Sequence, residues 1–161
     1  PRRFADARAV IEPTADDEKA AVCAELLRGL PDWFGIPEAI DCYVAEVPAL
    51  PMLVAREGGR PVGFVTLLRH APVAWELHLI AVAADRHRRN IGRQLLAAAE
   101  AAVRAQGAIY LSVKTLSAAN PEPPYAATRR FYDAMGFVPL MELPTLWSSD
   151  NPCLVMVKRL G

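Results

Sequence analysis

The sequence has only three cysteines, Cys23, Cys42 and Cys153, and they lie far apart in the chain. An odd number of separated cysteines argues against a disulfide framework and favours a reducing compartment, so we expect a cytoplasmic protein. No two cysteines have the spacing of metal ligands, and the three histidines lie in unrelated contexts. We therefore expect no metal site.

Excess charge and long apolar segments are also lacking. Eighteen basic side chains balance eighteen acidic ones, which gives a formal net charge of zero. Proteins that hold nucleic acids or anionic membranes through bulk charge are usually basic, so neither is an expected partner. No apolar run approaches the roughly 20 residues that a membrane span requires. The first residues, PRRFADARAV, lack the apolar core of a signal peptide.

The chain does contain enough apolar material for one core. Its 161 residues fit a single domain over 1–161, and 53% of them are hydrophobic, which excludes general disorder. Thr14 is a candidate N-cap for a first helix that ends at Gly29. Further helices are predicted at 37–46, 91–106 and 125–135, and strands at 8–12, 52–56, 62–68, 74–82, 109–113, from 137 onward, and 153–158. This mixed order predicts an α/β (α+β) fold with helices on both faces of a sheet.

The most informative stretch is 81–96, with the sequence AVAADRHRRNIGRQLL. An apolar strand ends at Val82, and a helix opens around 90–92, so several arginines crowd a helix N-terminus. That end of a helix already carries partial positive charge, so cations there are unfavourable unless an anion binds. Free backbone N–H groups together with arginines suit a pyrophosphate, and Gly92 lets the backbone approach it closely.

Two other phosphate-binding patterns are absent from the sequence. There is no GxxxxGK[ST] motif of nucleotide hydrolases and no GxGxxG motif of dinucleotide-binding proteins. A solvated basic helix start is the alternative interpretation of the arginines. Nucleic-acid binding through 86–93 conflicts with the zero net charge.

The strand–loop–helix with HRRNIGRQLL resembles the acyl-CoA pyrophosphate loop of the GNAT superfamily, the acetyl-CoA-dependent N-acetyltransferases. The family pattern is Arg or Gln, two residues, Gly, one residue, then Gly or Ala. This chain has His87 at the first position, Asn90 at the first glycine and Gly92 at the last. Asn90 is a reasonable substitute because asparagine adopts positive φ more readily than most residues.

A second segment, ATRRFYDAMGF at 127–137, resembles the later helix of the same family, in which an aromatic–Tyr pair precedes a Gly-Phe turn. The family often has Asn seven residues before that Tyr, where this chain has Tyr125. The closing segment LPTLWSSDNPCLVMVKRL is similar to small bacterial GNAT proteins. The resemblance covers about residues 50–161, with the two motifs in the family's order.

The resemblance implies the GNAT fold, a central mixed and mostly antiparallel sheet of six to seven strands. This sheet contains a splayed parallel pair and is flanked by about four helices. The resemblance also implies acetyl-CoA as cofactor. The residues it assigns to cofactor binding are Ile80, Ala81, Val82, His87, Arg88, Arg89, Asn90, Ile91, Gly92, Arg93, Gln94, Asn120, Tyr125, Thr128 and Arg129.

For catalysis, the resemblance implies that Tyr132 is the general acid that protonates the leaving thiolate. The alternative interpretation is a helix tyrosine whose ring packs on the core. Glu76 and His78 lie two residues apart on one strand, so their side chains share a face and both are candidate bases. An acceptor that arrives as the neutral amine needs neither of them. The alternative interpretation is structural, with Glu76 paired to an arginine and His78 a hydrogen-bonded strand residue.

Trp33, Phe34 and Trp75 are candidate walls of an acceptor pocket, with packing in the core as the alternative. The predicted reaction is direct transfer of acetyl from acetyl-CoA to a primary amine of a small molecule or peptide in a ternary complex. The second hypothesis is a catalytically silent acyl-CoA-binding regulatory module. The C-terminal strands also offer an edge for pairing in a homodimer.

Overall fold

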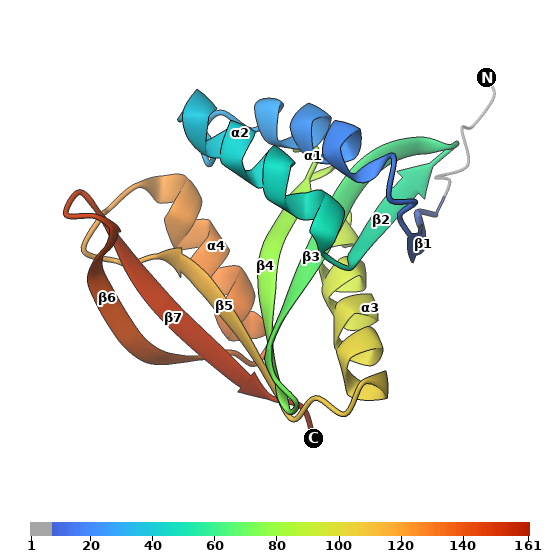
Figure 1. The fold of residues 1–161 in the computed structure, drawn as a ribbon. Coiled ribbons are helices and arrows are strands. Elements are labelled where there is room, and N and C mark those ends of the chain that lie inside the picture. Colours follow the sequence, from blue (N-terminus) through green and yellow to red (C-terminus); the bar gives the residue numbers. More distant parts are fainter. Residues whose placement is uncertain (1–7) are drawn as a thin grey trace. The chain divides into compact units, whose positions relative to one another are not determined.

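The computed structural model describes residues 8–161, and Figure 1 shows its ribbon. Within these residues, seven strands, four α-helices and two short 3-10 helices follow one another. They are β1 (Val10–Pro13), α1 (Lys19–Arg28), α2 (Pro37–Glu46), η1 (Val47–Ala49), β2 (Met52–Glu57), β3 (Arg60–Ala71), β4 (Ala74–Val82), η2 (Ala84–Arg86), α3 (Ile91–Ala105), β5 (Tyr110–Leu116), α4 (Pro123–Ala134), β6 (Val138–Ser148) and β7 (Asn151–Arg159). None of these helices is long and apolar enough to cross a bilayer.

The strands form one seven-stranded sheet in the order β1-β2-β3-β4-β5-β7-β6. The pairs β1–β2, β2–β3, β5–β7 and β6–β7 are antiparallel. The β4–β5 pair is parallel, from Ala74 opposite Tyr110 to Leu77 opposite Val113. Parallel neighbours need a long crossover, which α3 supplies. The predicted mixed, mostly antiparallel sheet is confirmed.

The chain forms two compact units, and each unit is built from two separate segments of the sequence. The first comprises the residues up to Leu67 together with Leu79–Ala99. The second comprises Leu68–His78 and Glu100–Gly161. Each unit has its own core and carries its own set of predicted site residues, so each is described by itself.

In the first unit, α1 and α2 pack on β2 and β3 (Figure 1). The apolar stripe predicted for the first helix is buried there, and Leu26 and Leu27 join Ile40, Val54 and Phe64 in one core cluster. The second helix has the predicted bounds 37–46 and begins at a proline, which suits the first helical position because its missing N–H would have no partner there.

Thr14 does not cap the first helix, so this prediction was wrong. Its N–H donates to the carbonyl of Met52 at 2.9 Å, which continues the β1–β2 pairing by one residue. The helix begins only at Lys19, whose Nζ donates to the carbonyl of Leu50 at 2.7 Å and pairs with Asp16. Thr14 therefore lies five residues before the first helical residue, and its hydroxyl does not cap the first turn.

Gly63 lies on β3 where the backbone of another strand and the helix α3 approach it closely. A Cβ at this position would lie 3.0 Å from the carbonyl oxygen of Ala81 and 3.0 Å from Cδ1 of Leu95. We predict that Gly63→Ala lowers the free energy of unfolding by about 1–3 kcal/mol, because a packed core does not yield to an added methyl. Gly29→Ala is the matched control, since its Cβ would meet only ordinary contacts at 3.5 and 3.6 Å. Equal urea midpoints for both variants would contradict this prediction.

In the second unit, β5 lies between the first half of β4 and β7, and α4 packs on β5 (Figure 1). Tyr132 and Phe137 are buried in this unit. Lys158 on β7 donates to Glu100 in α3 at 2.6 Å. β5 extends to Leu116, three residues beyond the predicted end. The added residues pair with β7 as far as Cys153, and sequence periodicity does not show such a partner.

Candidate functional site

The loop between β4 and α3 has an unusual backbone in the first unit. Arg88 has a φ of 62° and Asn90 a φ of 65°, the left-handed region that side chains other than glycine rarely adopt. The sequence analysis predicted that Asn90 can replace the glycine of the family pattern because asparagine tolerates positive φ. Asn90 does have a positive φ in the structure. Its carbonyl accepts from the N–H of Gln94 at 3.1 Å, which makes Asn90 the residue at which α3 opens.

The left-handed backbone gives a test that needs no ligand. Asn90→Gly is expected to retain or raise the free energy of unfolding, because glycine adopts positive φ without cost. Asn90→Val is expected to lower it by roughly 1–2 kcal/mol, because a β-branched residue clashes with its own backbone there. Arg89→Val, at a neighbouring residue whose φ is not positive, is expected to cost clearly less. Urea titration measures the free energy of unfolding of all three variants. Similar losses for Asn90→Gly and Asn90→Val would show that the positive φ at position 90 does not disfavour a β-branched residue.

The arginines of this loop divide into two groups. Arg86 is held inside the unit, since its Nε donates to Glu57 at 2.7 Å and its Nη1 to Asp85 at 2.8 Å. The hydrogen bond to Glu57 is the main cause that raises the pKa of Arg86. Arg88, Arg89 and Arg93 are exposed around the first turn of α3. Arg86 therefore anchors the loop to the end of β2, and the other three provide its exposed positive charge.

His87 is turned back toward β4. Its Nε2 lies 2.8 Å from the carbonyl oxygen of Val82, and its ring meets Trp33 edge-on with the centroids 5.4 Å apart. The imidazole thus connects the loop to the end of β4 and to Trp33. Trp33 and Phe34 both pack against the core of this unit. The ring of Phe34 also contacts the ring of Tyr43 edge-on. Burial raises the pKa of the Tyr43 phenol.

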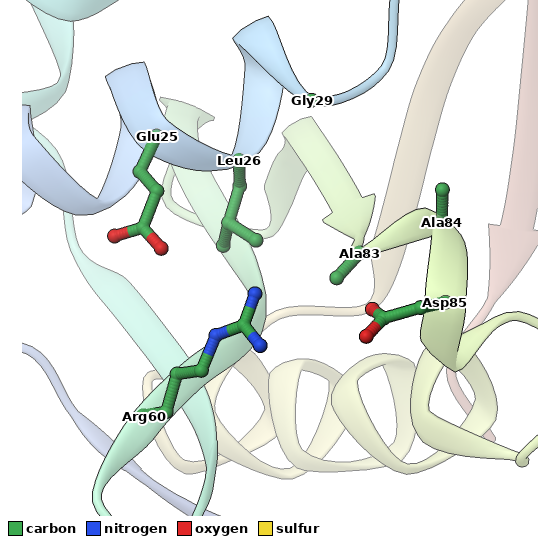
Figure 2. Close-up of a pocket in the computed structure, with 7 residues that line it drawn as sticks. All are labelled: Glu25, Leu26, Gly29, Arg60, Ala83, Ala84 and Asp85. Carbon is green, nitrogen blue, oxygen red and sulfur yellow. The ribbon is translucent and has the colours of Figure 1, made fainter.

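A small open pocket of about 240 Å³ lies next to the start of this loop. Figure 2 shows Arg60 extended between the carboxylates of Glu25 and Asp85, with the side chains of Leu26 and Ala83 nearby. The other lining residues are Gly29 and Ala84. None of the residues predicted to bind substrate or cofactor lines this pocket. Its lining comes from three separate segments, so no local sequence pattern could have indicated it.

In the second unit, Glu76 is buried and its carboxylate has partners. Nζ of Lys114 lies 3.0 Å from each carboxylate oxygen, and His70 also hydrogen-bonds to Glu76 Oε2. The structural alternative predicted an arginine as the partner of Glu76, whereas its partners in the structure are a lysine and a histidine. His78, two residues on, is half-buried. Sequence reasoning missed both partners because Lys114 comes from β5 and His70 from β3, outside any local motif.

Trp75 is largely buried, with the guanidinium of Arg69 5.9 Å from its ring centroid. Within the part of the chain that the structure describes, the indole N–H has no hydrogen-bond acceptor. A buried indole N–H usually finds a partner. The structure thus places the predicted pocket residue Trp75 in the second unit, and Trp33 and Phe34 in the first.

Tyr132 lies fully inside the second unit on α4. Its ring contacts Phe131 and Phe137 edge-on, with centroid distances of 5.5 and 5.6 Å. Burial raises the pKa of the Tyr132 phenol well above its ordinary value. The hydroxyl is therefore a hydrogen-bond donor that stays protonated at neutral pH.

The side chains predicted to contact the cofactor near α4 have internal hydrogen bonds. Nη1 of Arg129 donates to the carbonyl of Leu116 at 2.7 Å, which ties α4 to the end of β5. Nδ2 of Asn120 donates to the carbonyl of Asp150 at 2.9 Å, and Oγ1 of Thr128 donates within its own helix. Tyr125 is half-buried in the first turn of α4. Arg129, Asn120 and Thr128 therefore each make a hydrogen bond within the chain that supports the local fold.

Comparisons with known families and solved structures concern the family and the fold of the chain. Residues 48–139 match the family described as the acetyltransferase (GNAT) domain. Among solved structures, the chain is similar to a GNAT-family acetyltransferase of Desulfovibrio desulfuricans, with 21% identity, TM-score 0.82, and coverage of 95% of this chain and 99% of that one.

Two further structures are similar in fold. The aminoglycoside 6′-N-acetyltransferase of Enterococcus faecium has 21% identity and a TM-score of 0.72, and the match covers 94% of this chain and 97% of that one. A GNAT-family acetyltransferase of Elizabethkingia anophelis with acetyl-CoA bound has 17% identity, TM-score 0.69, and coverage of 96% and 99%. No curated protein sequence matches the chain. Because the family match covers more than half of the sequence, the chain belongs to the GNAT acetyltransferases.

Proposed function

We propose that this chain transfers an acetyl group from acetyl-CoA to a primary amine of a small molecule or peptide, by direct attack in a ternary complex. The observation that carries the proposal is the β4–α3 loop, where two left-handed residues precede a helix N-terminus surrounded by exposed arginines. Backbone N–H groups of such a loop suit an anionic diphosphate, and exposed guanidinium groups strengthen the attraction.

The residues present fit the pyrophosphate of acetyl-CoA. Arg88, Arg89 and Arg93 would supply charge, and the backbone of 87–94 would supply N–H donors. Gly92 has no Cβ and would let a phosphate approach the first turn of α3 closely. The strand residues Ile80, Ala81 and Val82 would pair with the pantetheine arm as a neighbouring strand does. Acetyl-CoA, when bound, supplies the acetyl group as an activated thioester.

The chain's own residues would then handle protons and charge. A backbone N–H among 80–82 would polarise the thioester carbonyl, because a fixed donor stabilises the negative charge that develops on that oxygen. Tyr132 would donate its hydroxyl proton toward the leaving sulfur. Because burial raises the pKa of this phenol, the site would have to favour the transfer by stabilising the phenolate that remains. The sequence left Glu76, His78 or neither as the acceptor of the amine proton.

The proposal is tested by incubating the protein with acetyl-CoA and three amines of different class. We would use an aminoglycoside, a simple alkylamine and a peptide with a free N-terminus, and follow thiol release together with the mass of the product. Acetylation of any of them above the protein-free rate supports the transferase. Tight acetyl-CoA binding with no turnover across a broader panel of amines would favour the regulatory acyl-CoA-binding module.

A further inference from the structure

The two edge strands of the sheet differ in length and in charge. β1, at one edge, is four residues long and carries Glu12, which pairs with Arg56 on β2. β6, at the other edge, is eleven residues long, and Glu142 is its one charged side chain. The Glu142 carboxylate accepts a hydrogen bond from the hydroxyl of Ser117 in the same unit. Edge strands of soluble proteins are usually short or charged, so β6 is unusual.

β6 exposes large apolar side chains at both of its ends, where it lies beside β7 as the last strand of the sheet (Figure 1). The start group comprises Val138, Leu140 and Met141, and the end group comprises Leu146 and Trp147. All five are between 46% and 57% exposed. The two groups lie roughly 15–20 Å apart, at about 3.3 Å per strand residue. Single exposed apolar residues are ordinary, whereas five on one strand indicate a surface for a partner.

The backbone of β6 departs twice from regular pairing with β7. The register shifts once over residues 139–141, where Leu140 is the extra residue, and again over residues 143–148. Such bulges bend a strand and change the direction of its side chains. Leu140, Leu146 and Trp147 all lie in these two irregular segments. Three of the five exposed apolar side chains therefore lie where the strand leaves its ladder with β7.

Two prolines disfavour the addition of a further strand to β6. Pro139 and Pro144 have no N–H to donate. Prolines in edge strands have this missing donor on the solvent side, so they interrupt the row of groups to which another strand would bind. A partner of β6 would therefore pack on the exposed side chains and would not extend the sheet through a continuous backbone ladder.

We propose that a second copy of this chain packs on β6 and forms a two-fold symmetric dimer. When two copies of β6 cross in opposite directions, the start group of one copy meets the end group of the other, and symmetry supplies the reverse contact. One partner thus covers both groups, which lie too far apart for a small ligand. The single charge of β6 is hydrogen-bonded within its unit, so little on this strand would attract a nucleic acid, a charged peptide or an anionic membrane.

The exposed area is adequate for such a dimer. At about half exposure, five large side chains present roughly 500 Å² of apolar surface per copy. With the residues between the two groups, a two-fold contact would bury about 1,200–1,600 Å² in total, which is the lower half of the usual range for specific interfaces. The two-fold axis would pass near Leu143, between the groups. Because each copy has one such surface, association should stop at two copies.

The first test is the molar mass of the protein in solution. Sedimentation equilibrium from roughly 1 µM to 1 mM covers the affinities in which weak and moderate dimers fall. We expect the mass to rise with concentration to that of two chains and to stay there. A single-chain mass over the whole range, or a mass that continues to rise beyond two chains, overturns the proposal. The measurement needs neither acetyl-CoA nor an amine, so its result is independent of the proposed function.

Charge substitutions locate the interface. Trp147→Glu and Leu140→Lys each place a charge in an apolar contact, and each is expected to raise the Kd of dimerisation by about 30-fold or more, as central interface residues do. Both side chains are exposed, so the fold should be retained, and circular dichroism checks this. Val73→Glu is the matched control, at an exposed apolar residue of the same unit outside β6. An equal loss in the control, or no loss in the β6 variants, overturns the proposal.

Mixing the two β6 variants tests how the strands cross. In a mixed dimer the introduced ammonium meets the introduced carboxylate at one contact, and Leu140 meets Trp147 at the other. Dimers of either variant alone would place a charge against an apolar side chain at both contacts. We therefore expect the mixture to form a dimer more tightly than either variant does, measured by native mass spectrometry with one variant isotope-labelled. A mixture that remains as single chains overturns the crossed arrangement.

Discussion

Replacing Arg88 and Arg93 by glutamate is expected to weaken acetyl-CoA binding by roughly 100-fold or more, since each charged hydrogen bond to a phosphate contributes about 1.5–3 kcal/mol. Both side chains are exposed beside the N-terminus of α3, so the change should leave the fold intact. Isothermal titration of the double variant measures the loss. The wild-type affinity should also fall as salt concentration rises, and the variant should show a weaker salt dependence.

The control must carry the same change in net charge. Arg8 and Arg159 are exposed arginines outside the loop. The double variant Arg8→Glu with Arg159→Glu is expected to bind acetyl-CoA with nearly wild-type affinity. Equal losses in the two double variants would show that binding depends on overall charge and would remove the specific role of the loop.

Tyr132→Phe is expected to lower turnover by about 100-fold, the size of effect that a general acid contributes, while acetyl-CoA affinity stays nearly unchanged. Phenylalanine keeps the edge-on packing with Phe131 and Phe137, so only the hydroxyl is lost. Steady-state kinetics with saturating acetyl-CoA gives the turnover, and titration gives the affinity. Tyr110→Phe, at an exposed tyrosine, is the matched control.

The pH dependence adds a second readout for Tyr132. Because burial raises the pKa of this phenol, its proton is retained to higher pH than in an exposed tyrosine. Turnover limited by this group should therefore not decline below about pH 10, the ordinary value for tyrosine. A Tyr132→Phe variant with unaltered turnover would exclude Tyr132 from the mechanism.

Elements dominated by local signals could be predicted from the sequence. The second helix begins at Pro37 and ends at Glu46 as predicted, and β4 has the predicted bounds 74–82. In the loop, asparagine at position 90 indicated a left-handed backbone, and the structure has it. In these places residue type and spacing favour the same conformation, and no distant partner competes.

Features that depend on a distant partner could not be predicted in this way. Thr14 has the chemistry of a capping residue, but it continues the pairing with β2 at Met52, and the helix begins only at Lys19. Glu76 gains Lys114 and His70 from two other strands. Arg88 adopts a left-handed φ although arginine has no intrinsic preference for it, so the loop as a whole imposes that conformation.

Thermal unfolding with and without acetyl-CoA tests most directly whether this chain binds the cofactor on which the proposed function depends. At a hundred times the dissociation constant, binding should add about 2.7 kcal/mol to the free energy of unfolding. For a chain of this length that corresponds to a rise in Tm of roughly 5–10 °C. We predict this shift with acetyl-CoA and with free CoA, and little shift with ATP. No shift with either CoA form, or an equal shift with ATP, would contradict the assignment.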